Sequence, residues 1–215
     1  RRLQPHQVSA GDSARGFGPP PRALLTTFTA AERAARPRFV AFKDAGLHVW
    51  RGLRTFAVFD AGAVCPAYLP AHGQADTLTV EVWIDGARVV ADPGVSDYSG
   101  AERARERSSR AHSTVTLDDA DHAEVYDRFR VGGLPRLESV IVQGEGVTAA
   151  LRPFGSAARI VRTVRWGAQP GAVLRIVDRV DGAGGAVVRS RLVLDPDVTL
   201  DLAGDGRVAR VTTAR

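Results

Sequence analysis

Short runs of alternating apolar and polar residues, separated by turn-forming residues, make up most of the chain from residue 46 onward. The clearest run is residues 77–84, Thr-Leu-Thr-Val-Glu-Val-Trp-Ile, which is followed by Asp85-Gly86 and a second run at 87–91. Alternation with a period of two is typical of strands with one buried face, and Asp-Gly is a favoured two-residue turn between antiparallel strands. This stretch therefore predicts a β-hairpin.

The same pattern continues to the end of the chain. Strands are predicted in order at 46–51, 55–59, 113–117, 123–129, 137–142, 147–151, 158–164, 173–180, 186–194, 198–202 and 207–213. Many short strands with turn residues between them, and no alternation of strands with helices, indicate a mainly β fold, an antiparallel β-sandwich. Residues 1–22 are instead rich in Gly, Pro, Ser and Arg, and 23–36 favour one short helix. We expect a short N-terminal helical and loop extension over 1–44 and a β domain over 45–215.

Charge and cysteine content exclude several classes of protein. The formal net charge is +5, spread along the chain, which favours an acidic partner such as a polyanionic sugar over nucleic acid. The single cysteine, Cys65, excludes an internal disulfide and a zinc site built from cysteines. No apolar run is long enough for a transmembrane segment. The chain begins at Arg1 without Met or a signal peptide, so we interpret it as a fragment of a longer protein whose localisation is left open.

Polar side chains that can bind ligands lie at the predicted strand ends. Asp76 precedes the first strand of the hairpin, Asp92 follows the second, and His72 and His112 flank the whole region. A hairpin brings its outer ends together, so residues 74–76 and 92–94 should lie side by side. Loops at strand ends are held by a rigid scaffold and are common places for functional sites.

The middle of the chain resembles a known family. The resemblance is carried by Ala45-Gly46-Leu47, Trp50-Arg51, Phe59-Asp60-Ala61-Gly62, His72-Gly73-Gln74-Ala75-Asp76-Thr77-Leu78, Asp92-Pro93-Gly94, Tyr98, Arg107-Ser108-Ser109-Arg110-Ala111-His112-Ser113-Thr114-Val115 and Glu124-Val125. In this order the blocks resemble the C-terminal β-sandwich, a supersandwich-like domain, of heparinase II/III-type polysaccharide lyases. The resemblance covers about the middle 85 residues.

This resemblance implies an enzyme that pairs the β domain with a helical (α/α) toroid and cleaves uronate-containing polysaccharide between the two. It implies a catalytic role for His72 and a zinc site at the positions of Gln74, Asp92 and His112. Gln74 stands where the family usually has histidine, and an amide is a poor zinc ligand beside imidazole and carboxylate. Ser113 also replaces the usual asparagine. The expected metal ligands are therefore Asp92 and His112, and without the toroid we expect the chain to be inactive.

The chemistry itself points to further residues. β-Elimination beside a uronate needs a base for the C5 proton, an acid for the leaving oxygen and a cation for the carboxylate. His72 and Tyr98 are the expected catalytic groups, because His and Tyr suit proton transfer. Arg107 and Arg110 are expected to bind the sugar carboxylate, because arginine prefers planar carboxylates, and Gln74 is assigned to the same substrate contacts.

Each assignment has a structural alternative. Asp92-Pro93-Gly94 is a turn signature in its own right, and His112 would also be satisfied by bonding Asp92 without a metal. Tyr98 would serve as a packing residue, Asp76 as a loop brace, and the arginines at 103–107 as a solvated helix face. Two other functions remain open. One is a non-catalytic module that binds acidic glycan or packs on another domain, and the other is a metal-dependent hydrolase that uses His72, Asp92 and His112.

Overall fold

The computed structural model describes residues 38–52, 54–66, 68–167, 174–207 and 209–213, and the structural statements below refer to these residues. The strands are β1 (Phe39–Phe42), β2 (Leu47–Arg51), β3 (Thr55–Asp60), β4 (Val80–Ile84), β5 (Ala87–Val90), β6 (Val115–Leu117), β7 (Val125–Tyr126), β8 (Arg130–Val131), β9 (Arg136–Gln143), β10 (Gly146–Arg152), β11 (Arg159–Trp166), β12 (Leu174–Asp181), β13 (Val188–Ser190), β14 (Val198–Leu202) and β15 (Ala209–Thr213). The helical turns are η1 (Lys43–Ala45), η2 (Pro70–His72), α3 (Glu102–Glu106) and η3 (Ser109–Ala111).

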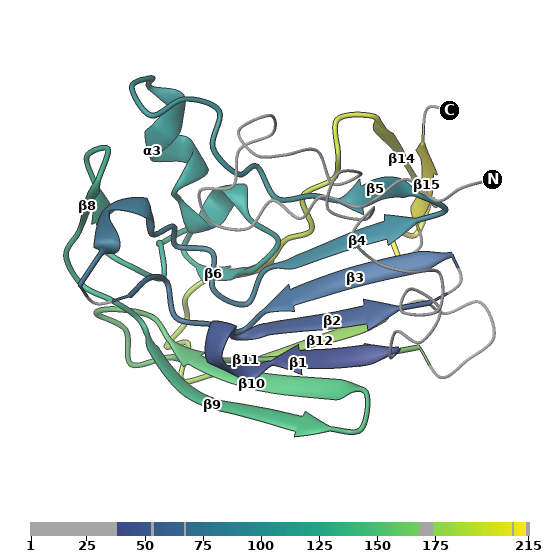
Figure 1. Cartoon of the computed structure of the whole chain (residues 1–215), viewed down its shortest axis with the longest axis horizontal. Coiled ribbons are helices and arrows are strands. Elements are labelled where there is room, and N and C mark those ends of the chain that lie inside the picture. The colour runs from purple at the N-terminus through teal and green to yellow at the C-terminus, as the bar shows by residue number, and fades with distance from the viewer. Residues whose placement is uncertain (1–37, 53, 67, 168–173, 208, 214–215) are drawn as a thin grey trace, which may run out of the picture.

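Two antiparallel sheets form the layers of the sandwich (Figure 1). The first has the strand order β1-β2-β3-β4-β5, and the second has the order β12-β11-β10-β9. Trp50 and Phe59 from the first sheet pack with Val147, Leu151 and Ile160 from the second, and none of these side chains is exposed. Burying each large apolar side chain contributes about 1.5–3 kcal/mol, so the contact between the sheets is a main source of stability. The predicted antiparallel β-sandwich is confirmed.

A buried arginine joins the two layers. Arg162 lies on the inner face of β11 and forms two hydrogen bonds with the Asp178 carboxylate of β12, at 2.7 and 2.8 Å. Its remaining donors reach the carbonyl oxygens of Leu78, at 2.8 Å, and Ser113. A buried guanidinium needs such a full set of acceptors, because an unpaired buried charge is costly. Arg162 therefore fixes the backbone at Leu78 and Ser113 against strand β11.

The predicted hairpin is present as strands β4 and β5. Ile84 pairs with Ala87, and the two residues between them, Asp85 and Gly86, both have positive φ angles of 54° and 84°. That combination is the hairpin turn for which Asp-Gly is favoured. The first strand begins at Val80 rather than at residue 77, because Leu78 has a φ of 70° and interrupts the extended conformation.

Other predicted strands are shorter than the sequence indicates. The run 123–129 forms only β7, because Asp127 has a φ of 58° and turns the chain back so that Tyr126 pairs with Arg130 of β8. The run 186–194 forms only β13. The helix predicted within 23–36 lies outside the described residues. Strand β1 precedes residue 45 and is nevertheless hydrogen-bonded to β2 in the first sheet.

The segments that carry most of the predicted site residues gather at one end of the sandwich. Helix α3 and strand β8 lie at this end, and strands β14 and β15 lie at the other (Figure 1). Strand β8 contacts η2, and α3 contacts η3, so four short elements form a rim around the ends of the longer strands. Within the described part of the chain, no helix is both long and apolar enough to cross a membrane.

Candidate functional site

His72 lies on the rim as the last residue of η2, and its side chain is exposed. The edge of its ring faces Tyr98, with 5.8 Å between centroids, and Phe129, with 6.5 Å. Tyr98 and Phe129 are stacked on each other at 6.1 Å and are 37% and 43% exposed. The two residues expected to be catalytic are thus neighbours. Phe129 completes an aromatic cluster that no sequence spacing pointed to, because it comes from the turn before β8.

Two arginines of the helix region hold the loop that carries His72. Arg103 donates to the carbonyl oxygens of Ala71, at 3.5 Å, and Arg128, at 3.2 Å. Arg107 donates to those of Gly73, at 2.9 Å, and Asp127, at 3.0 Å. Both side chains are fully buried, so the arginines were wrongly assigned to a solvated face. Their spacing of four places them on the same face of the helix.

The guanidinium of Arg103 also lies against the aromatic cluster. Its central carbon is 5.1 Å from the centre of the Tyr98 ring and 5.9 Å from that of Phe129. A guanidinium over an aromatic face is attracted by the ring quadrupole, by about 0.5–2 kcal/mol depending on how far it is desolvated. The same side chain therefore fixes both the loop of His72 and the rings beside it.

Behind the rim, Asp92 and His112 form a fully buried pair. His112 Nδ1 lies 2.7 Å from Asp92 Oδ2, and His112 Nε2 lies 2.9 Å from the carbonyl oxygen of Glu106. The other Asp92 oxygen accepts a hydrogen bond from Gly94 N at 2.9 Å, which closes the predicted Asp-Pro-Gly turn. Burial alone would lower the pKa of His112, but the adjacent Asp92 carboxylate raises it to about 9. His112 is therefore an imidazolium that donates from both ring nitrogens.

Two further carboxyl groups lie in the electrostatic field of this pair. Burial raises the pKa of Asp76 to about 8, against the opposing effect of the His112 charge, and raises that of Asp60 to about 6. Asp60 accepts a hydrogen bond from Gly62 N at 2.7 Å. Behind the rim, Asp60 and Asp76 therefore lie close to the Asp92–His112 pair, and the pKa values of both Asp60 and Asp76 are raised toward neutral pH.

The residues expected to contact substrate occupy different environments. The Gln74 side chain is fully buried, and its Nε2 lies 3.4 Å from the carbonyl oxygen of Gly94, which confirms that the two ends of the hairpin meet. Arg107 is also fully buried, where it cannot reach a sugar without leaving the carbonyl groups it holds. Arg110, in η3, is exposed, and its Nε lies 3.3 Å from Ser108 Oγ. Among Gln74, Arg107 and Arg110, only Arg110 is positioned to meet a ligand from solvent.

As arranged here, these side chains do not fit a zinc ion. A metal-binding histidine must present a lone pair on one ring nitrogen, whereas both ring nitrogens of His112 face oxygen acceptors. Both oxygens of Asp92 also have protein partners. In the described ranges, no three His, Cys, Asp or Glu side chains form a group that could hold a metal ion.

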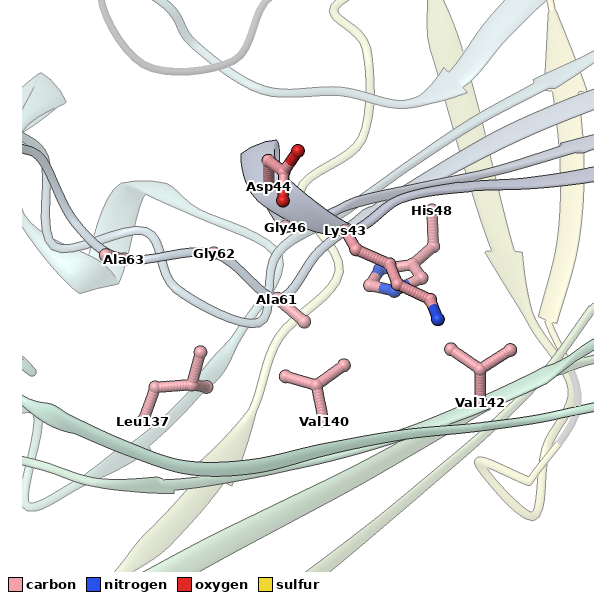
Figure 2. A pocket seen from close by; sticks show the side chains of 10 residues that line it. All are labelled: Lys43, Asp44, Gly46, His48, Ala61, Gly62, Ala63, Leu137, Val140 and Val142. Atoms are coloured by element: carbon pink, nitrogen blue, oxygen red, sulfur yellow. The ribbon is translucent and has the colours of Figure 1, made fainter.

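A separate cavity of about 520 Å³ opens between strand β9 of the second sheet and the chain around η1 at one end of the first sheet (Figure 2). Val140 and Val142 of β9 line one side of it, and Lys43 and the buried His48 line the other. Burial lowers the pKa of His48, so this imidazole is neutral near pH 7. None of the predicted site residues lines this cavity, which is therefore a different feature from the rim.

The buried cluster predicts a fall in stability as pH rises. The folded state raises the pKa of His112 from 6.5 to about 9 and that of Asp76 from 3.8 to about 8. The folded protein therefore holds an extra proton on His112 between pH 6.5 and 9, and an extra proton on Asp76 between pH 3.8 and 8. The contribution of His112 is complete below pH 6.5 and is lost through pH 9, and it is on the order of 3 kcal/mol. Thermal unfolding from pH 6 to 10 should show Tm decreasing. A His112→Gln variant should reduce the slope of this decrease between pH 6.5 and pH 9, and an unchanged slope would contradict this assignment.

Removing one of the loop-holding arginines should destabilise the fold. In Arg107→Met the carbonyl groups of Gly73 and Asp127 lose their donor, so we expect the free energy of unfolding to fall by about 2–4 kcal/mol. Arg105→Met on the same helix is the matched control, because Arg105 is exposed and its pairing with Glu102 contributes about 0–1 kcal/mol. Urea unfolding of both variants makes the comparison. Equal losses would show that Arg107 does not hold the loop.

The two antiparallel sheets packed face to face define the chain as a β-sandwich domain. Residues 34–215 match the family described as Heparinase II/III-like, C-terminal, so the chain belongs to that family. A solved structure described as a heparinase III gene product matches with a TM-score of 0.59 and 23% identity over 80% of this chain. The heparan sulfate lyase HepC from Pedobacter heparinus matches with a TM-score of 0.56 and 22% identity over 79% of it.

These likenesses concern the fold, and they concern only part of each longer protein. The chain spans about a quarter of the length of these two solved structures, 26% of each. No match was found among curated proteins.

Proposed function

We propose that this domain forms one side of the active site of a carbon–oxygen lyase that cleaves uronate-containing acidic polysaccharide by β-elimination. A helical (α/α) toroid domain of the same protein supplies the other side and the remaining catalytic groups. Alone, the β domain is inactive, because the sugar lies between the two domains.

The exposed His72 on a loop held from beneath is the observation that carries the proposal. An exposed loop histidine is ordinarily mobile, whereas buried Arg103 and Arg107 bond the carbonyl groups on either side of His72. Such support fixes a proton-transfer group to within the small tolerances that catalysis needs. The side chain meanwhile faces solvent, where a sugar can approach it.

The proposed reaction needs three events in this space. A base removes the C5 proton beside the carboxylate, the resulting electron pair forms the C4=C5 double bond, and the C4–O bond breaks as its oxygen receives a proton. We assign His72 and Tyr98 to proton transfer, because their rings adjoin each other on the rim. Exposed Arg110 is assigned to the sugar carboxylate, where positive charge stabilises the developing anion. No step is assigned to zinc, since the residues present do not fit it.

Assay of the full-length protein tests this function. Incubation with heparan-like, alginate-like and other uronate-containing polysaccharides should produce the ultraviolet absorbance of unsaturated uronate. Reducing ends without that absorbance would indicate hydrolysis and would contradict the proposal.

A non-catalytic module is the second candidate, and the buried pair favours it. The family's expected ligand positions Asp92 and His112 are satisfied by each other and by backbone groups, as they would be in a domain that has lost a metal centre. Such a module would bind acidic polysaccharide in the same experiment without releasing unsaturated product. A metal-dependent hydrolase is not favoured, because His112 offers no lone pair to a metal in this arrangement.

A further inference from the structure

The outer face of the second sheet carries an unusual distribution of charge. Strand β12 alternates strictly between half-buried and exposed residues, so one side of the sheet packs on the core and the other faces solvent. Across β11 and β12 the outward pairs, from one end to the other, are Arg165 with Arg175, Thr163 with Val177, Val161 with Arg179, and Arg159 with Asp181. In Figure 1 this sheet is the lower layer, and its outer face is turned away from the first sheet.

Arg165 and Arg175 are direct cross-strand partners of the same charge. Both are exposed, and neither has an ion-pair partner in the described part of the chain. Side chains opposite each other on antiparallel strands lie about 5 Å apart, where like charges are destabilising. Gly146, the partner of Arg165 on β10, leaves room for this side chain, because a Cβ there would lie only 2.9 Å from Arg165 Cγ. The strand pairing thus maintains a repulsion that a bound anion would relieve.

The opposite end of the same face is also basic, with four arginines beside two carboxylates, but each of these arginines has a carboxylate partner. Glu138 accepts hydrogen bonds from Arg136, at 2.6 Å, Arg152, at 3.0 Å, and Arg159, at 2.7 Å, and these bonds lower its pKa to about 2. Asp181 pairs with Arg179 at 3.0 Å. Among the described residues of this face, Arg165 and Arg175 are thus the cross-strand arginine pair that has no carboxylate partner.

A neutral row separates the two basic ends. It consists of Ile141, Thr148, Thr163 and Val177, in which the two threonine hydroxyls share a hydrogen bond at 3.0 Å. Ile141 and Val177 are 50% and 45% exposed. Along β12, Arg175 and Arg179 are four residues apart, which is about 13 Å of strand. The face is thus mildly apolar in the middle, with arginines on either side of this row along the strand direction.

We propose that the outer face of strands β9–β12 binds a segment of acidic polysaccharide, with its carboxylate or sulfate groups on Arg165 and Arg175. Planar guanidinium groups bind such anions with paired hydrogen bonds, and the neutral row accommodates the apolar faces of sugar rings. The choice of a sugar polyanion rests on the proposed function. Binding at this face requires no catalytic turnover, so it can be measured and contradicted independently of the lyase reaction.

Binding to defined heparin oligosaccharides tests the proposal in the full-length protein carrying His72→Ala, which prevents cleavage during the measurement. We expect the double variant Arg165→Gln/Arg175→Gln to weaken binding at least tenfold and to reduce its salt dependence. The matched control is Arg207→Gln/Arg210→Gln, which removes the same charge from exposed positions in the β14–β15 hairpin and should change affinity less than twofold. Equal weakening by both pairs would overturn the proposal, because it would show an effect of net charge alone.

A single variant separates this site from a merely structural role. Arg175→Glu converts the like-charge pair into an opposite-charge pair, so we expect it to raise Tm while lowering oligosaccharide affinity. Unchanged affinity would overturn the proposal. Short duplex DNA, tested at equal salt, is the competing polyanion, and a preference for DNA over heparin would likewise overturn it. If binding is lost in the double variant while the unmodified protein yields no unsaturated product, the result supports the binding surface and contradicts only the proposed lyase reaction.

Discussion

Replacing His72 with alanine in the full-length protein should lower kcat/KM for β-elimination by about 10²–10⁴-fold, the usual contribution of a positioned acid or base. The imidazole is exposed on the rim, beside Tyr98, and its loop is held by backbone contacts that the substitution leaves intact. Stability should therefore change by no more than about 0.5 kcal/mol, as for other surface substitutions. The measurement is the rate of absorbance increase from unsaturated uronate, with Tm recorded for each variant.

Tyr98→Phe is the companion variant, because it keeps the ring that stacks on Phe129 and removes only the hydroxyl group. A large loss of kcat would assign proton transfer to the phenol, whereas full activity would assign Tyr98 to packing. If His72→Ala retains activity within about threefold, the catalytic role of His72 is excluded, since such a change amounts to less than 1 kcal/mol of the barrier.

Replacing Asp92 with asparagine should lower the free energy of unfolding by about 3–5 kcal/mol, the typical cost of removing one partner from a buried ion pair. The substitution leaves the His112 imidazolium without its counter-charge, while the size of the side chain stays the same. For a chain of this length the loss corresponds to a decrease in Tm of roughly 6–20 °C. Thermal and urea unfolding at pH 7 both measure it.

The same substitution at Asp85 is the control. Asp85 lies in the exposed hairpin turn, where solvent screens its pairing with Arg54 and asparagine tolerates the positive φ. Comparable losses at the two positions would contradict the importance of the buried pair. Chelator treatment of the unmodified protein adds a second readout. A decrease in Tm of several degrees would show that a metal, rather than the Asp92–His112 pair, holds this region together.

Much of the fold followed from local patterns. The hairpin of β4 and β5 was predictable because Asp85-Gly86 favours one turn geometry and the flanking residues alternate with the period of a strand. The strand ends were less predictable. Leu78 adopts a positive φ angle that leucine rarely takes, so its residue type gave no sign of the interruption. Asp127 also has a positive φ, which aspartate tolerates, but it lies inside an alternating run that predicted a continuous strand.

The sequence predicted which segments of the candidate site lie close together, but it did not predict the contacts between their side chains. Sequence order and the hairpin placed residues 74–76 beside 92–94, and the contact from Gln74 to Gly94 bears this out. The burial of Arg103 and Arg107 could not be predicted, because an arginine-rich helix of this composition is usually solvated. Phe129 escaped notice because its contact with His72 joins separate loops, and no spacing within either loop encodes it.

The sequence by itself determined the mainly β character of the chain and the position of many strands along it, since a period of two and a turn residue act over only a few neighbouring positions. Only the tertiary structure decided which charged groups are buried, because burial depends on what packs against each side chain from elsewhere in the chain. Asp92 and His112 show the difference most clearly. The same two residue types would suit a metal centre in an open site. Here, one ring nitrogen of His112 is hydrogen-bonded to the Asp92 carboxylate and the other to the carbonyl oxygen of Glu106, so the two residues form an internal ion pair.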